Sequence, residues 1–251
     1  MTQLSPSQFE HIAAVARTEA GIDLREERAE MVRARLQRRL RGLGLSDFDR
    51  YCELVTADSP SGAAERARLV DALTTQVGRP FREHHHFDLL RDHVVRRLSH
   101  RPEAHIRIWS AGCADGDEPC SIVQSLCHID GLSPERLTVW ATDISASALD
   151  ATRRRIADPA QEVDLSWAAS IKVERHNLMD PPPCADNDAI FCRNVTIYFD
   201  AATTAAVQER LASTARDGAL YCLGHSERLI ARRVDSRARR IGPSAYVLRG
   251  A

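Results

Sequence analysis

Five short β-rich runs that alternate with helical segments constrain the fold of this chain most strongly. They read HIRIWSAG, RLTVWATDI, SIKVERHNL, DAIFCRN and GALYCLG, and helical patterns lie near residues 117–129, 145–156 and 201–216. Such alternation is typical of a parallel sheet with helices on both faces. A further strand pair is expected around Gly242 and Pro243. We therefore expect an α/β fold in the carboxyl-terminal part of the chain.

The amino-terminal part has helical patterns instead. A capping-box pattern, SPSQ at residues 5–8, opens a first helix. A second helix carries an apolar stripe, and we expect Ser46 to cap a third. The turn SPSG at residues 59–62 precedes a fourth helix. We therefore divide the chain into an all-helical domain, residues 1–74, and an α/β domain, residues 75–251.

Composition and charge exclude several classes of function. The formal net charge of -1 and the pI near 6.8 give no whole-protein argument for nucleic acid or an anionic membrane as partner. The seven cysteines include no Cys-x-x-Cys pair, and the sequence shows no signal-peptide or membrane-span pattern. We therefore expect a reduced, cytoplasmic protein that is not inserted in a membrane. We expect no metal site, because the consecutive histidines 84–86 point in different directions on a helix.

The loop SAGCADGDEP, residues 110–119, follows the first strand and begins the next helix. Its glycines allow the backbone to approach a ligand closely. It lacks the glycine patterns of dinucleotide and phosphate loops, and Asp115, Asp117 and Glu118 would repel a phosphate. The loop therefore suits a ligand of little negative or of positive charge.

Further polar side chains follow the later strands. Asp143 lies where such folds place an acid that accepts hydrogen bonds from ribose hydroxyls. The stretches HNL, residues 176–178, and CRN, residues 192–194, each offer a side-chain amide. Arg82, at the junction of the two domains, could reach the same edge. A positively charged nucleoside without phosphates is S-adenosylmethionine, whereas a nicotinamide cofactor fits Asp143 but not the glycine loop.

Six ordered motifs resemble the CheR-type chemoreceptor glutamate O-methyltransferases over nearly the whole chain. They read LTTQVGRPFREHHHF, SAGCADGDEPCSI, ATDISASALDATRR, RHNLMDPPP, IFCRNVTIYFD and LGHSERL. The resemblance implies a Rossmann-like methyltransferase domain preceded by a small all-helical domain, with S-adenosylmethionine between them. It also implies that the products are a glutamate methyl ester and S-adenosylhomocysteine.

The resemblance also assigns roles to single residues. Arg82 and Tyr198 match the residues near the transfer site and are the expected catalytic residues. The expected cofactor-binding residues are Gln76, Gly78, Arg82, Glu118, Asp143, Asn177, Leu178, Arg193 and Asn194. The expected partner is the acidic methylation helices of a chemoreceptor, received by Arg35, Arg38 and Arg39.

The chain departs from the family pattern at several points. Gln76 and Gly78 replace an asparagine and a threonine that help to contact the cofactor, and Cys120 replaces a tyrosine. The segment from about Asp150 to Arg175 is shorter than in members that carry a peptide-docking subdomain. We therefore expect no docking on a receptor-tail pentapeptide. The departures leave one alternative open, a degenerate CheR-like signalling or scaffold protein with weak or no cofactor binding.

Overall fold

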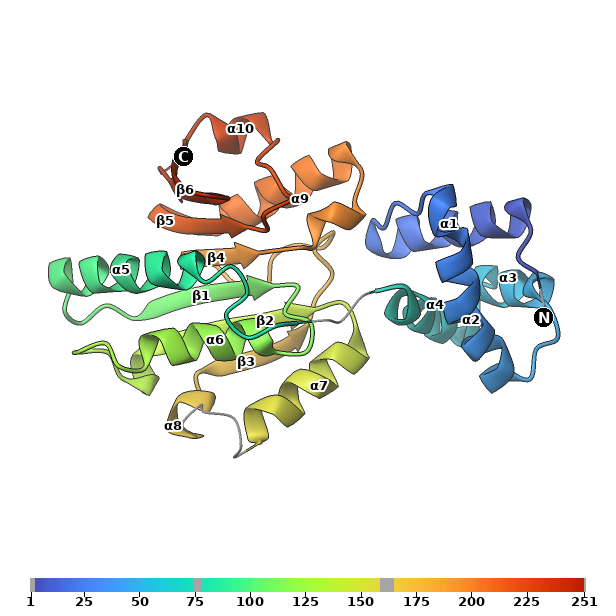
Figure 1. Cartoon of the computed structure of the whole chain (residues 1–251), viewed down its shortest axis with the longest axis horizontal. Helices are drawn as coiled ribbons and strands as arrows, with labels where there is room; N and C mark the ends of the chain where they lie inside the picture. The colour runs from blue at the N-terminus through green and yellow to red at the C-terminus, as the bar shows by residue number, and fades with distance from the viewer. Residues whose placement is uncertain (1–2, 75–77, 159–164, 251) are drawn as a thin grey trace. The chain divides into compact units, whose positions relative to one another are not determined.

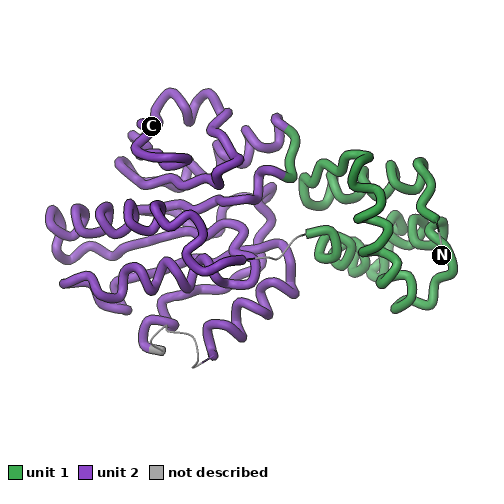
Figure 2. The backbone as a smooth tube through the Cα atoms, in the orientation of Figure 1, with its two compact units in different colours: residues 1–75, 198–200 green, residues 76–197, 201–251 purple. Residues whose placement is uncertain are grey.

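The computed structural model describes residues 3–74, 78–158 and 165–250. The chain divides into two compact units (Figure 2). We call residues 1–75 with 198–200 the helical unit, and residues 76–197 with 201–251 the sheet unit. Gln76, one of the predicted cofactor-binding residues, lies outside the described residues.

The helical unit consists of α1 (Pro6–Ala20), the short η1 (Glu26–Arg28), α2 (Ala29–Leu43), α3 (Phe48–Thr56) and α4 (Pro60–Leu73). The predicted capping box of α1 is confirmed, because the Ser5 side chain accepts from the Gln8 N–H and the Gln8 side chain accepts from the Ser5 N–H. The predicted cap of α3 is wrong by one residue. Asp47 caps this helix by accepting from Arg50 N at 3.0 Å, and the Ser46 hydroxyl donates to Asp47.

Two arginines of α2 have structural partners within the helical unit. Arg39 binds the Glu65 carboxylate through Nε and Nη2, at 3.0 and 2.6 Å, and Glu65 itself is buried. Arg35 donates to the backbone carbonyls at the end of α4, the closest being Leu73 O at 2.7 Å. Arg38, by contrast, is exposed. Of the three arginines predicted to receive a partner, two therefore also hold this unit together.

A short segment from the later part of the chain belongs to the helical unit. Residues Tyr198–Asp200 group with it, and Phe199 forms an antiparallel bridge with Ile22. The Asp23 N–H donates to Tyr198 O at 2.7 Å, and the Arg28 guanidinium lies 5.3 Å from the centre of the Tyr198 ring. This long-range pairing was not predicted from the local sequence patterns.

Among its described residues, the sheet unit contains seven strands in the order β3-β2-β1-β4-β5-β7-β6. The strands are β1 (Ile106–Ala111), β2 (Leu137–Asp143), β3 (Ile171–Arg175), β4 (Asn187–Cys192), β5 (Ala215–Leu223), β6 (Ala238–Gly242) and β7 (Ala245–Leu248). Strands β1 to β5 are parallel to one another, and β7 is antiparallel to both β5 and β6. The predicted parallel sheet and the terminal strand pair are therefore confirmed.

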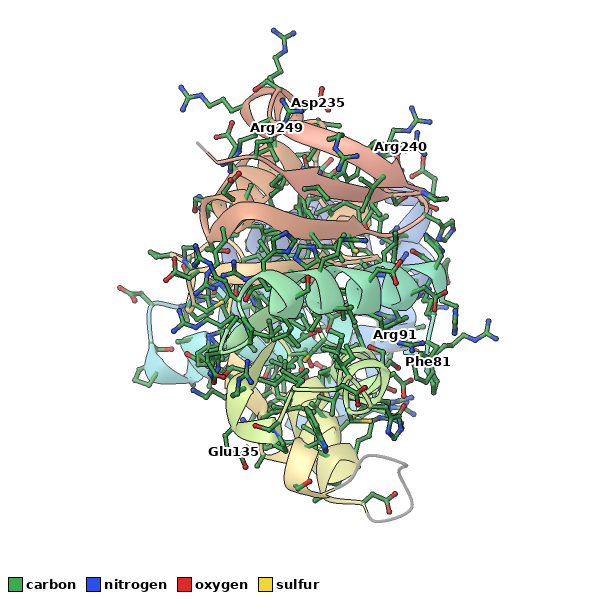
Figure 3. The ribbon with its side chains drawn as sticks, turned by 90° about the vertical axis from the view of Figure 1, so that its left-hand side faces the viewer. Phe81, Arg91, Glu135, Asp235, Arg240 and Arg249 are labelled. Carbon is green, nitrogen blue, oxygen red and sulfur yellow. The ribbon has the colours of Figure 1, made fainter. Side chains whose placement is uncertain are left out.

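Helices connect and cover these strands (Figure 1). They are α5 (His85–His100), α6 (Asp117–Leu126), η2 (Pro134–Arg136), α7 (Ala146–Ala157), α8 (Leu165–Ala168), η3 (Thr196–Tyr198), α9 (Ala201–Ser213) and α10 (Arg232–Asp235). Between α7 and β3, α8 is the only regular element within the described residues. At the β6 edge, Asp235, Arg240 and Arg249 are exposed, and Figure 3 shows their side chains extending outward.

The strand order places a topological switch between β1 and β4. The chain runs from β1 outward to β2 and β3, then returns to pair β4 with the other side of β1. β4 is buried along its whole length, and Ile106, Ile108 and Phe191 lie in the core. In open α/β sheets, ligands bind at the carboxyl ends of the strands beside such a switch.

Candidate active site

The loop after β1 brings Glu118 into the first turn of α6 at the carboxyl edge of the sheet. Its Oε1 accepts from the Ser110 hydroxyl at 2.7 Å, and its Oε2 lies 3.1 Å from the Arg193 guanidinium. Burial raises the pKa of Glu118, while Arg193 and Ser110 act in the opposite direction. The predicted residues Glu118 and Arg193, which follow different strands, are therefore in direct contact.

Arg193 follows β4 and links three segments of the sheet unit. Besides Glu118, its Nη2 lies 3.5 Å from Glu83 Oε2 and donates to the Arg82 carbonyl. Glu83 also accepts from the His225 backbone N–H at 3.2 Å and from its Nδ1 at 3.1 Å. Burial opposes the shift, but Arg193 and the His225 hydrogen bonds lower the pKa of Glu83 on balance. Sequence reasoning assigned no role to Glu83.

Asp143 ends β2 and binds two backbone N–H groups. Its Oδ2 accepts from Ala114 N at 3.0 Å and its Oδ1 accepts from Ser145 N at 2.9 Å. Ala114 belongs to the loop after β1, so Asp143 fixes that loop to the end of the neighbouring strand.

Asn194, directly after Arg193, has a left-handed backbone with φ of 61°. The buried Glu227 holds this conformation: its Oε2 accepts from Asn194 N at 2.7 Å and from Gly224 N at 2.6 Å. Its Oε1 accepts from Val195 N at 3.0 Å and from the Thr196 N–H and hydroxyl at 2.7 Å each. Sequence reasoning did not identify Glu227 as a site residue, although the motif GHSE contained the signal.

Gly78 lies against the acidic loop. A Cβ added at this position would be 2.2 Å from Asp115 Oδ1 and 2.6 Å from Asp117 Oδ2. Arg155 of α7 pairs with both carboxylates, at 3.2 Å from Asp115 and 2.8 Å from Asp117. Burial, together with Asp115, raises the pKa of Asp117. The threonine that the family resemblance leads one to expect at position 78 therefore has no room beside these two acids.

The remaining predicted residues lie at different places. Asn177 accepts from Met179 N at 3.1 Å after β3, and Leu178 beside it is half-buried. Arg82 is exposed and, within the described residues, its guanidinium makes no hydrogen bond or ion pair. Tyr198 groups with the helical unit. The structure thus brings together Gly78, Glu118, Asp143, Arg193 and Asn194 at one edge of the sheet unit.

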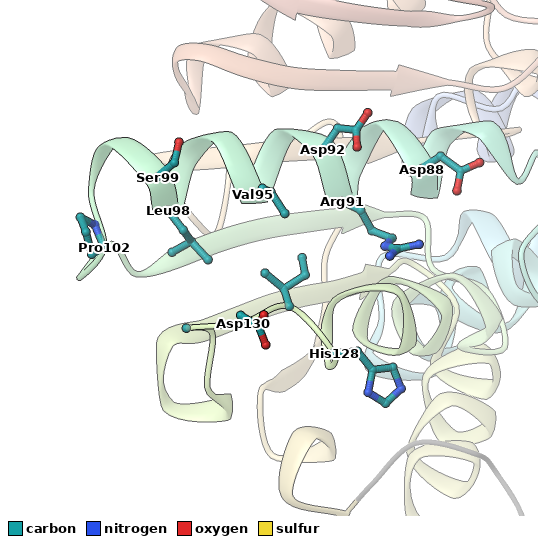
Figure 4. Close-up of a pocket in the computed structure, with 11 residues that line it drawn as sticks. Asp88, Arg91, Asp92, Val95, Leu98, Ser99, Pro102, His128 and Asp130 are labelled. Carbon is teal, nitrogen blue, oxygen red and sulfur yellow. The ribbon is translucent and has the colours of Figure 1, made fainter.

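A cavity in another part of the sheet unit does not involve the predicted site residues. A groove of about 620 Å³ runs between α5 and the loop after α6, and Pro102, before β1, lies on its wall. Figure 4 shows Arg91, Val95 and Leu98 pointing from α5 toward that loop. The groove is lined by none of the predicted site residues. Within the described part of the chain, no group of three or more His, Cys, Asp or Glu residues could hold a metal ion.

Comparison with known protein families covers most of the chain. The family described as "CheR methyltransferase, all-alpha domain" matches residues 7–74. The family described as "CheR methyltransferase, SAM binding domain" matches residues 76–169 and 154–240. The chain belongs to the CheR methyltransferase family.

Individual CheR relatives agree with the family match. A "Probable chemotaxis protein methyltransferase" of Rhizobium etli is 38% identical over 240 residues, which span 84% of this chain and 89% of the relative. The "Chemotaxis protein methyltransferase" of Escherichia coli is 34% identical and covers 89% of this chain and 85% of its own length. The "Chemotaxis protein methyltransferase" of Salmonella typhimurium is 35% identical, and the match covers 90% of this chain and 86% of the relative. No described helix of this CheR protein is long and apolar enough to span a membrane.

The side chains at the sheet edge fit S-adenosylmethionine, the cofactor of this family. Acidic groups predominate there, since Asp115, Asp117 and Glu118 follow β1 and Asp143 ends β2. Gly112 keeps the loop close to β4, because a Cβ there would be 2.4 Å from Val195 Cγ2. Carboxylates can accept from ribose hydroxyls and balance a positive charge. The residues present therefore fit a cationic nucleoside.

Proposed function

We propose that this CheR protein transfers a methyl group from S-adenosylmethionine to glutamate side chains of a chemoreceptor. The observation that carries the proposal is the edge formed by Glu118, Asp143 and Asn194, three residues from three strand ends. This edge lies within a chain whose relatives are named chemotaxis methyltransferases. Glutamate as the acceptor, and the ester as the product, are part of the proposal.

In this scheme Asp143 binds the ribose hydroxyls, and Glu118 and Gly78 border the charged end of the cofactor. The stretches Asn177–Leu178 and Arg193–Asn194 line the adenosine. Gln76 is the further residue proposed to contact the cofactor. Bound S-adenosylmethionine supplies a methyl group activated by a sulfonium.

The chemistry asks mainly for positioning. A glutamate carboxylate with an ordinary pKa near 4.3 is ionised at neutral pH, so the protein needs no general base. The exposed Arg82 guanidinium can bind one oxygen of the incoming carboxylate and orient the other, and Tyr198 is the second proposed catalytic residue. Correct alignment of two reacting groups contributes large effective molarities.

The proposed partner surface is the arginine face of α2. Arg38 is exposed and available to an acidic receptor helix, whereas Arg35 and Arg39 would contribute while holding their structural bonds. We also propose a cytoplasmic location, no docking on a receptor-tail pentapeptide, and folding of residues 1–74 and 75–251 as separate domains. Nucleic acid is not among the proposed partners.

Calorimetric titration with S-adenosylmethionine and with S-adenosylhomocysteine tests the proposal first. We expect micromolar binding of both ligands. If neither ligand bound, the degenerate scaffold protein would be favoured instead. Next, a receptor cytoplasmic fragment is incubated with labelled S-adenosylmethionine. Release of the label as methanol in mild alkali is expected for a glutamate ester, and alkali-stable label would contradict it.

A variant of Arg82 separates binding from transfer. Arg82→Ala should keep cofactor affinity within about threefold, since the side chain acts on the acceptor, while the turnover rate falls by about two orders of magnitude. Asp143→Asn should instead weaken the cofactor itself. Loss of cofactor binding in Arg82→Ala with unchanged turnover of the bound fraction would contradict the role of Arg82.

A further inference from the structure

Both terminal nitrogens of the Arg193 guanidinium are occupied by other protein groups, whereas its buried Nε has no hydrogen-bond partner among the described residues. Its side chain is 3% exposed and lies between the carboxylates of Glu118 and Glu83, at 3.1 and 3.5 Å. It also donates to the Arg82 carbonyl and lies 5.6 Å from the centre of the Phe87 ring. A buried arginine is costly unless it is paired. Arg193 has pairs on two sides, and both partners belong to segments of the candidate site.

The segment that carries Arg82 needs such support. The residues on either side of Arg82, Phe81 and Glu83, have φ values of 50° and 57°, which are unfavourable for residues with a side chain. Strained backbone persists when surrounding contacts hold it. The Arg193 bond to the Arg82 carbonyl and the Arg193–Glu83 pair are two such contacts.

We propose that Arg193 is a positioning residue of the transfer site, whose guanidinium holds Glu118 and the Arg82 segment in place without itself contacting cofactor or acceptor. The inference rests on the proposed function and extends it. The backbone of Arg193 can still line the cofactor. The side chain acts through Glu118, which faces the cofactor, and through Arg82, which faces the acceptor.

Removal of the guanidinium would leave the half-buried Glu118 without its counter-charge. Besides Arg193, Glu118 is faced by the Ser110 hydroxyl, by Glu83 and by the thiols of Cys113, Cys192 and Cys222. Burial raises the pKa of all three thiols, and it lowers the pKa of the neighbouring His86 to about 4. These groups therefore stay neutral between pH 6 and 8.5. His225 also contacts Glu83, in wild type and variant alike, so a pH effect that appears only in the variant would report the two carboxylates.

The first test measures the affinity for S-adenosylhomocysteine between pH 6 and 8.5. Wild type should bind with little pH dependence. Arg193→Gln should bind about tenfold or more weakly at pH 6 and recover toward pH 8.5 as Glu118 ionises. Arg193→Lys, which keeps the charge, should recover part of the affinity at low pH. Weakening by the same factor at every pH would indicate direct contact with the ligand and overturn the proposal, as would unchanged binding.

Arg97→Gln is the matched control, because Arg97 pairs with the buried Asp188 at the opposite end of β4, at 3.2 Å. It removes one of the two arginines that pair with this buried carboxylate, Arg216 at 3.5 Å being the other, and leaves the carboxyl edge intact. Affinity and its pH profile should match wild type in this variant. A pH-dependent loss equal to that of Arg193→Gln would mean that any weakened buried pair produces the effect, which would overturn the specific role of Arg193.

A second measurement needs no ligand and separates this inference from the proposed function. Amide hydrogen exchange of the ligand-free protein should become faster at residues 79–85 in Arg193→Gln and stay unchanged there in Arg97→Gln. If wild type binds neither nucleoside, the proposed function fails, but the exchange pattern still tests the positioning role. Unchanged exchange at residues 79–85 in Arg193→Gln would overturn it.

Discussion

The Glu227 carboxylate accepts the backbone N–H of Asn194 at 2.7 Å and joins the end of β4 to the loop after β5. The same oxygen accepts from Gly224, which has no room for a side chain because a Cβ there would lie 2.7 Å from both Asn194 Nδ2 and Glu227 Oε2. One buried acid thus fixes the left-handed conformation of Asn194. It also fixes Thr196, two residues before Tyr198.

Glu227→Gln should therefore weaken both stability and cofactor binding. A glutamine has a single acceptor oxygen, so it cannot serve the backbone N–H groups on both sides, and each unsatisfied donor costs about 1–3 kcal/mol. We expect the free energy of unfolding to fall by about 2–4 kcal/mol and the affinity for S-adenosylhomocysteine to fall about tenfold. Denaturant unfolding and calorimetry measure the two effects.

The exposed Glu209 provides the control for that variant. Glu209→Gln should leave stability and affinity at the wild-type values. If Glu227→Gln lost stability but bound the ligand with full affinity per folded molecule, the conformation of Asn194 would not be coupled to cofactor binding.

Gly78 is expected to be interdependent with the acids beside it. Gly78→Thr would place a Cβ into contact with the Asp115 and Asp117 carboxylates, which Arg155 holds in place. Overpacking of this kind typically costs about 1–3 kcal/mol. Denaturant unfolding of the double variant, Gly78→Thr with Asp115→Ala, measures the coupling. Its loss of unfolding free energy should be smaller than the sum of the two single losses by about 1 kcal/mol or more.

The same double-mutant cycle has an internal reference. Gly42, on α2, has nothing within 4 Å of an added Cβ, so Gly42→Thr should not couple to Asp115→Ala. If the effects of Gly78→Thr and Asp115→Ala on stability were also additive, the Asp115 carboxylate would move away freely. That outcome would contradict its restraint by Arg155.

The arginines of α2 should separate into two classes. Arg38→Glu should leave the melting temperature unchanged, because Arg38 is exposed, and should raise KM for a receptor substrate by repelling its acidic helix. Arg39→Ala should lower stability by about 3–5 kcal/mol, since it leaves the buried Glu65 without its closest partner. Thermal unfolding and methylation kinetics distinguish the two, and an unchanged KM for Arg38→Glu would remove Arg38 from the docking surface.

Much of the fold was predictable because strand and helix periods are local properties of the sequence. The strands β1, β2 and β4 and the helix α1 follow directly from apolar periodicity and a capping pattern. The cap of α3 was misplaced because Ser46 and Asp47 compete for one role, and the carboxylate accepts from the Arg50 N–H while the Ser46 hydroxyl donates to the carboxylate.

The placement of Glu118, Asp143 and Asn194 at one edge of the sheet was predictable, because side chains that follow parallel strands meet at one edge. The residues that hold them in place were not. Glu83 meets Arg193, and Glu227 meets Asn194, through loops that return to the sheet from distant parts of the sequence. Sequence spacing does not encode such contacts, nor the pairing of Phe199 with Ile22.

His86 should make stability depend on pH. Its side chain is fully buried, and its Nε2 donates to Pro243 O at 3.1 Å. Burial, and then Arg193, lower its pKa from 6.5 to about 4, while Glu83 acts in the opposite direction and His85 adds to the lowering. Below pH 6.5 the unfolded chain binds a proton that the folded protein does not bind. The contribution of His86 is therefore present above pH 6.5 and is lost as the pH falls toward 4.

At about 1.4 kcal/mol per pKa unit, this loss is on the order of 3 kcal/mol at pH 4. His86→Gln keeps a donor toward Pro243 O but cannot titrate, so its unfolding free energy should fall less steeply than that of wild type between pH 7 and 4.5. The exposed His100 serves as the control, and His100→Gln should follow the wild-type slope. Parallel curves for wild type and His86→Gln would show that His86 takes up its proton in the folded protein as readily as in the unfolded chain.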